Sequence, residues 1–130
     1  MTKPNCVSPK IQQVSDQLKA VFPASKDYWT TRAEELLLVL LVGLPSLKKY
    51  ASDTLSYKCR VVRRSVDCDN ILTVLNSISI RKEAKDPTIQ QSLSFFLHLH
   101  EKCNVNGGIQ LSGIIATMMS YISKYIHDNP

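Results

Sequence analysis

The sequence predicts an all-α protein, a single compact bundle of five or six helices around a central apolar helix. Apolar residues recur at intervals of three and four along most of the chain, which is the spacing of one face of an α-helix. The 130 residues include only 4 Gly and 6 Pro, too few for the many turns of an all-β fold. The stretch from Leu36 to Leu44 is apolar on every side, so it is expected to form the buried central helix.

The chain is long enough for one hydrophobic core. Residues 1–7 are expected to be a flexible N-terminal lead, and residues 8–130 a single helical domain. The first helix begins at Ser8-Pro9, because Pro is well placed at the first helical position after a capping Ser. Pro23 ends it. Its apolar stripe consists of Ile11, Val14, Leu18 and Val21.

The central helix is predicted to begin at Thr31-Arg32-Ala33-Glu34, which fits a capping box. Residues 23–29 then form the connection before it, and Gly43 and Pro45 end the helix. A buried strand is the alternative for this segment, since a short apolar run does not separate the two structures. The capping box and the many leucines favour the helix.

Residues 46–66 are predicted to form one long helix or two short ones. The apolar stripe of this segment contains Leu47, Ala51, Leu55, Cys59, Val62 and Val66. Asp67-Cys68-Asp69 interrupts the pattern and offers an Asp cap to the next helix, Ile71 to Ile78. Residues 77–80 alternate in polarity like a strand, so the end of that element stays open.

Two further helices are expected in the C-terminal part. Asp86-Pro87 starts a helix that runs to Cys103, and residues 104–108, rich in Asn and Gly, end it. The last helix spans Ile109 to about His127. Its core face consists of Leu111, Ile114, Ile115, Met118, Ile122 and Tyr125. A second face of small residues, where another helix could approach closely, consists of Gly113, Ala116, Thr117 and Ser120.

The chain contains no motif that supplies a nucleophile with its base or a loop for phosphate, so we expect no enzyme. His98, His100 and Cys103 are the only local cluster of metal-ligand types, and helical spacing rotates His98 away from the other two. We therefore expect no metal site and no cofactor. The four cysteines are widely separated and are interpreted as reduced, buried thiols.

The longest apolar run is too short to span a membrane. The first five residues are polar and lead into no apolar signal region. Together with the reduced cysteines, this favours an intracellular protein, cytoplasmic or nuclear.

A basic patch is the best functional candidate, in a chain of net charge +5. The patch consists of Lys48, Lys49, Lys58, Arg60, Arg63 and Arg64. Helical spacing places the three arginines on one face. We interpret the chain as a non-enzymatic helical protein–protein interaction module, regulatory or adaptor in type, whose partner is an acidic protein, an amphipathic helix or a second copy. The alternatives are a basic RNA- or DNA-binding accessory protein that uses the same patch, and a merely solvated helix face.

Overall fold

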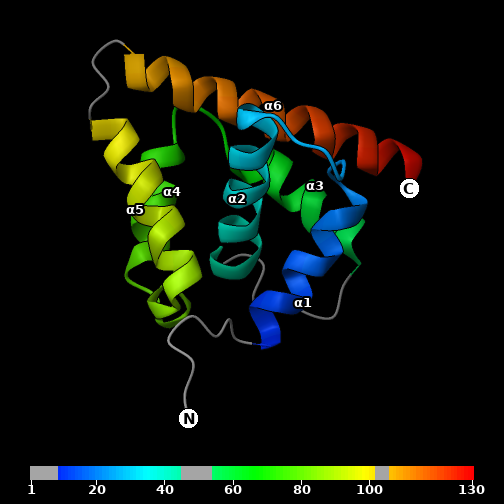
Figure 1. Cartoon of the computed structure of the whole chain (residues 1–130), viewed down its shortest axis with the longest axis horizontal. Coiled ribbons are helices and arrows are strands. Elements are labelled where there is room, and N and C mark those ends of the chain that lie inside the picture. Colours follow the sequence, from blue (N-terminus) through cyan, green and yellow to red (C-terminus); the bar gives the residue numbers. More distant parts are fainter. Residues whose placement is uncertain (1–8, 45–53, 102–105) are drawn as a thin grey trace.

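The computed structural model describes residues 9–44, 54–101 and 106–130, and every regular element in these ranges is helical (Figure 1). The predicted N-terminal lead lies outside the described residues. The six α-helices of these ranges form a compact bundle, which confirms the predicted fold class. The elements are α1 (Pro9–Gln17), the 3-10 turn η1 (Leu18–Ala20), α2 (Tyr28–Gly43), α3 (Leu55–Ser65), α4 (Ile71–Ser79), the 3-10 turn η3 (Lys82–Lys85), α5 (Pro87–Glu101) and α6 (Asn106–Asp128).

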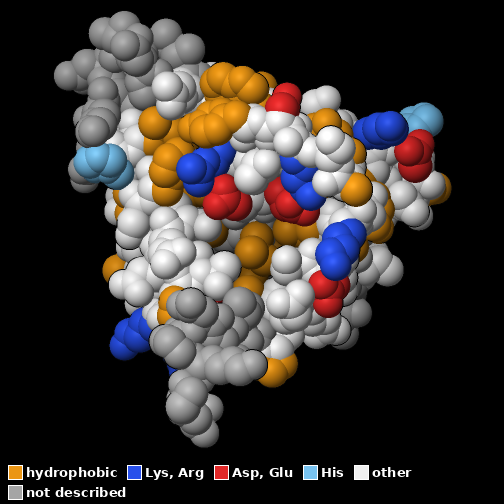
Figure 2. All heavy atoms as spheres, in the orientation of Figure 1, with side chains coloured by type: hydrophobic (Ala, Val, Ile, Leu, Met, Phe, Trp, Pro, Cys, Tyr) orange, Lys and Arg blue, Asp and Glu red, His pale blue; other side chains and the backbone are white. Residues whose placement is uncertain are grey.

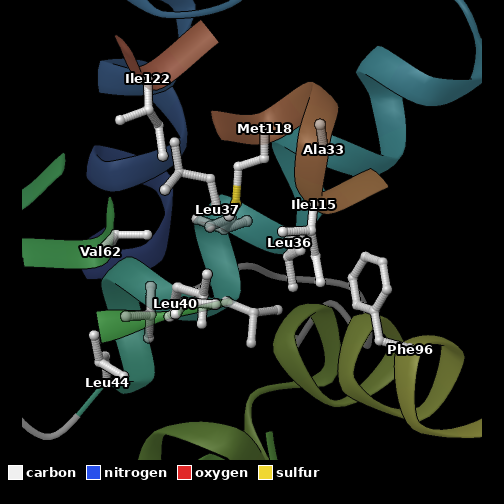
Figure 3. Close-up of a cluster of buried hydrophobic side chains, with 14 of the residues drawn as sticks. Ala33, Leu36, Leu37, Leu40, Leu44, Val62, Phe96, Ile115, Met118 and Ile122 are labelled. Atoms are coloured by element: carbon white, nitrogen blue, oxygen red, sulfur yellow. The ribbon is translucent and has the colours of Figure 1, made fainter. Parts of the chain in front are cut away.

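The apolar helix α2 is the centre of the bundle, as its sequence predicts. In Figure 1, α6 runs across the top of the molecule and α2 descends from it between α5 and α1. Leu37 and Leu40 of α2 are fully buried. Figure 3 shows them among side chains of three other helices, including Val62 of α3, Phe96 of α5 and Met118 of α6. The leucines of α2 are buried, except for the half-buried Leu41, because different helices cover its different faces.

The start of α2 differs from the prediction. Asp27 is the N-cap, and its Oδ1 atom accepts a hydrogen bond of 2.8 Å from the backbone N–H of Thr30. The expected capping box at Thr31 is therefore wrong, since Thr31 already lies inside the helix. Hydrogen bonds from the backbone and side chain of Thr30 lower the pKa of Asp27 from its ordinary value. Tyr28 and Trp29 belong to the first helical turn rather than to a connection.

The turn between α3 and α4 does not supply the expected Asp as the N-cap of α4. The carboxylate of Asp67 accepts hydrogen bonds of 2.9 Å from the backbone N–H groups of Asp69 and Asn70, which closes the turn. Asn70 is the N-cap residue of α4, and its side chain donates to the carbonyl of Ser65 at 2.8 Å. The helix then continues through Ser79, so the strand-like alternation of residues 77–80 does not form a strand.

The remaining boundaries agree with the prediction in part. Thr54 caps α3 by accepting from the N–H of Tyr57 at 3.2 Å, and the expected helical segment from 46 to 53 lies outside the described residues. Asp86 accepts from the N–H of Thr88 at 3.0 Å, which confirms the start of α5. The last helix begins at Asn106 rather than Ile109, so residues 106–108 are its first turn and not a stop signal.

The core face of α6 is confirmed. All the residues predicted for it are buried except Tyr125, which is half-buried, and Ile126 adds to the same face. Within the described ranges, no helix is both long enough and apolar enough to cross a membrane.

Gly43, in the last turn of α2, marks a close approach to α4. A Cβ atom at this position would overlap the side chain of Ile78, which is fully buried. We expect Gly43→Ala to lower the free energy of unfolding by about 1–3 kcal/mol, because overpacking outweighs the higher helix propensity of alanine. Urea unfolding measures this, and a variant as stable as the parent would contradict the close packing of α2 on α4.

Candidate protein-interaction site

Three arginines, Arg60, Arg63 and Arg64, form a positively charged surface on α3, called here the arginine face. The opposite side of the helix is anchored in the core by Cys59 and Val62, both fully buried. Arg63 and Arg64 are exposed, and Arg60 is half-exposed. The spacing of the three residues in α3 puts them on one side of the helix.

The arginine face has no internal partner in the part of the chain that the structure describes. No hydrogen bond or ion pair engages its three guanidinium groups there. Along the sequence, the arginine face is followed by two exposed carboxylates, Asp67 and Asp69, in the turn after α3. Arginines that form no ion pair with the described residues can bind an anionic group from outside.

The other predicted members of the basic patch do not join the arginine face. Lys58 precedes Arg60 by two residues, so the two side chains point about 200° apart around the helix. Lys58 is half-buried and has an interaction of its own within the protein. Lys48 and Lys49 lie outside the described residues. Of the six predicted residues, the three arginines share one side of α3 by helical spacing.

A second surface, missed by sequence reasoning, lies at the start of α2. Tyr28, Trp29, Arg32 and Phe95 of α5 form what we call the aromatic cluster. The Arg32 guanidinium lies 3.7 Å from the centre of the Phe95 ring and 5.6 Å from that of Tyr28. Tyr28 and Trp29 meet edge to face, with ring centres 5.5 Å apart. In Figure 2, hydrophobic side chains gather on the surface over this end of α2.

The aromatic cluster remains partly exposed. Tyr28 keeps 48% and Trp29 39% of their surface accessible. One edge of the Trp29 ring rests on Gly113, where a Cβ atom would lie 3.0 Å from it. The Trp29 ring thus packs on the small-residue face of α6 at Gly113. From the sequence, we expected a whole helix to approach this face. The signal for the cluster was present in the sequence: with Asp27 as the cap, Tyr28, Trp29 and Arg32 fall within the first turns of one helix.

A cavity of about 330 Å³ lies between the connection after η1 and the C-terminal part of α6. Its walls include Phe22, Tyr121, Lys124, Tyr125 and Asp128. Neither a cysteine nor a histidine lines it, so its walls do not assemble a Cys–His nucleophile.

The cysteines and histidines do not form a site among the described residues. His98 is exposed, and no group of three metal-ligating side chains comes together there. The side chains of His100 and Cys103 lie outside the described part. Cys59 is buried, as expected, whereas Cys68 is exposed in the turn between α3 and α4, so the prediction of a buried thiol is wrong for Cys68.

We expect the two described cysteines to react very differently with iodoacetamide. Burial raises the pKa of the Cys59 thiol to about 11, so it is uncharged as well as inaccessible at neutral pH. Cys68 should be alkylated in the native protein, and Cys59 only after unfolding in denaturant. Peptide mapping by mass spectrometry distinguishes them. Equal labelling of both thiols in the native protein would contradict the packing of α3.

Comparison with known protein families, curated proteins and solved structures found no match. Function is therefore inferred from the surfaces described above.

Proposed function

We propose that the chain is a non-enzymatic helical protein–protein interaction module, regulatory or adaptor in type, whose arginine face binds an acidic protein segment. One observation supports this most strongly: three guanidinium groups share one helix face, and none contacts a carboxylate among the described residues. Arginine suits this role because its planar group binds a carboxylate through two parallel hydrogen bonds.

The rigidity of α3 favours specific binding. Its buried residues fix the helix in the core, and the Ser56 hydroxyl at its start donates a hydrogen bond of 2.6 Å to the carbonyl of Asn129. The helix is thereby connected to the residues that follow α6. A partner then orders the ends of the arginine side chains but not the backbone that carries them, which reduces the entropic cost of binding.

The surroundings of the arginine face favour an acidic protein over a nucleic acid. Arg63 and Arg64 lie in the last turn of α3, at the negative end of the helix dipole. The exposed carboxylates of Asp67 and Asp69 follow immediately. A nucleic acid carries negative charge along its whole length and would be repelled where it passes these groups. A protein can place a few carboxylates on the arginines alone, and an acidic amphipathic helix fits this requirement.

The experiment that tests the proposal compares two labelled probes, a Glu-rich peptide and a DNA duplex matched to it in net charge. Each is titrated with the protein at about 50 and 200 mM salt, because phosphate binding weakens steeply over this range. We expect the peptide to bind more tightly than the duplex at the higher salt. Tighter binding of the duplex would instead support the RNA- or DNA-binding alternative. Binding of neither probe would contradict the arginine face as a site for anionic partners.

A further inference from the structure

We propose that the cavity at the C-terminal end of α6 binds a small aromatic zwitterion of the chemical class of a free aromatic amino acid. Such a ligand carries a planar ring, a carboxylate and an ammonium group. The inference goes beyond the proposed function, because the cavity and the arginine face share no residue. Either proposal can therefore fail while the other holds.

Two segments that are far apart in the sequence form the cavity. The connection after η1 contributes Phe22 and Pro23, and α6 contributes Tyr121 and Tyr125. Figure 1 shows this connection running beside the C-terminal half of α6. The volume of about 330 Å³ lies at the lower end of the range of about 300–1,000 Å³ that is typical of small-molecule sites. The ligand must therefore be small.

Aromatic rings give the cavity a wall that suits a planar ring. Phe22 is buried, and its ring centre lies 5.1 Å from that of Tyr121, with the two planes tilted by 47°. Tyr125 follows one helical turn later, and both tyrosines are half-buried. Aromatic rings prefer offset and tilted contacts of this kind, so a ligand ring can pack in the same way against the accessible parts of the tyrosines.

The tyrosines also offer polar groups to a ligand. Among the described residues, no hydrogen bond engages the hydroxyl of Tyr121 or of Tyr125, although the backbone carbonyl of Tyr125 accepts from Asn129. A phenol hydroxyl can donate to a carboxylate or accept from an ammonium group. The wall therefore combines apolar surface with a few polar groups, as small-molecule sites do.

Two side chains of opposite charge line the cavity one turn apart on α6. They are Lys124 and Asp128, and both are exposed. Lys124 forms no ion pair among the described residues, and the carboxylate of Asp128 contacts the exposed imidazole of its neighbour His127 at 3.4 Å. Lys124 can therefore bind a carboxylate of the ligand, and Asp128 an ammonium group.

The helix dipole sets the orientation of the ligand. Asp128 is the last residue of α6, at the negative end of the dipole, which adds to its attraction for a cation. The ammonium group therefore lies at this end, the carboxylate beside Lys124, and the ring against Tyr121. A ligand with a single charge would pair with only one of the two side chains. An acidic segment of the kind expected at the arginine face would be repelled by Asp128.

The test titrates the ¹⁵N-labelled protein with L-phenylalanine and with two analogues that each lack one charge, phenethylamine and 3-phenylpropionate. We expect amide shifts in residues 20–22 and 121–129, and L-phenylalanine should bind at least about threefold more tightly than either analogue, the scale of one exposed ion pair. No binding, equal affinity for all three compounds, or shifts confined to other parts of the protein would overturn the proposal.

Two variants assign the charges. Lys124→Met should weaken L-phenylalanine and 3-phenylpropionate at least about threefold without weakening phenethylamine. Asp128→Asn should weaken L-phenylalanine and phenethylamine without weakening 3-phenylpropionate. Both side chains are exposed, so both variants should keep their fold. A variant that weakens all three compounds equally would overturn the proposed pairing.

Lys10→Met is the matched control, because it removes one positive charge from an exposed side chain outside the cavity. This variant should bind L-phenylalanine like the parent protein. A loss as large as that of Lys124→Met would mean that net charge accounts for the binding, which would overturn the proposal. Variants that neutralise the arginine face should still bind L-phenylalanine, which separates a failure of this inference from a failure of the proposed function.

Discussion

Replacing Leu37 with alanine is expected to lower the free energy of unfolding by about 2–5 kcal/mol. Leu37 lies in the middle of α2, is fully buried, and faces Met118 of α6 (Figure 3). Helices on different sides of α2 hold the surrounding side chains, so the cavity left by the truncation cannot collapse easily.

Leu41→Ala is the matched control for Leu37→Ala. Leu41 is the same residue type, one turn further along α2, but it is only half-buried. We expect a clearly smaller loss of stability there, since less apolar area leaves water when it folds. Urea unfolding of both variants gives the comparison. Equal losses at the two positions would contradict the central place of α2 in the bundle.

Changing Arg60, Arg63 and Arg64 together to glutamine is expected to weaken binding of a Glu-rich peptide at least about tenfold, or ~1.4 kcal/mol. A single exposed ion pair contributes only about 0.2–1 kcal/mol, so the effect requires all three arginines to act together. The variant should remain folded, because Arg63 and Arg64 are exposed and no described hydrogen bond or ion pair involves the three side chains. Circular dichroism measures whether the variant is folded, and a peptide titration measures its affinity.

The control for the triple arginine variant removes the same charge elsewhere. Lys10, Lys82 and Lys85 are exposed and lie outside α3. Their joint replacement by glutamine should leave peptide affinity nearly unchanged at about 150 mM salt, where charges more than about 8 Å away are screened. If both triple variants lose affinity equally, net charge rather than the arginine face accounts for the binding.

The residues of the core were predictable because the spacing of apolar residues within each helix indicates which side is buried. The stripe of α6 follows from the spacing of Leu111, Ile114 and Met118, and the run of leucines in α2 indicates a helix covered on all sides. The same reasoning predicted the arginine face, since residues 60, 63 and 64 share one side of a helix. It also could have excluded Lys58, whose position on the opposite side follows from 3.6 residues per turn.

The aromatic cluster was not predictable in the same way. Asp27 and Thr31 are both acceptable caps, and the local pattern does not decide between them. The longer helix brings Trp29 against Gly113 and Arg32 against Phe95, contacts between residues far apart in the sequence. Likewise, the Asn-Gly residues at 106–108 suit a helix stop by local preference, yet the structure includes them in α6. Tertiary packing commonly overrides such preferences.

The central claim, that the arginine face is the surface that binds an acidic partner, is tested most directly by mapping the bound peptide on the protein. The measurement is a titration of the ¹⁵N-labelled protein with the Glu-rich peptide, followed by amide and arginine side-chain NMR shifts. We predict that the largest shifts lie in α3 between Leu55 and Ser65, with the Nε signals of the three arginines among them. Shifts that cluster on another element, with α3 unchanged, would contradict the claim.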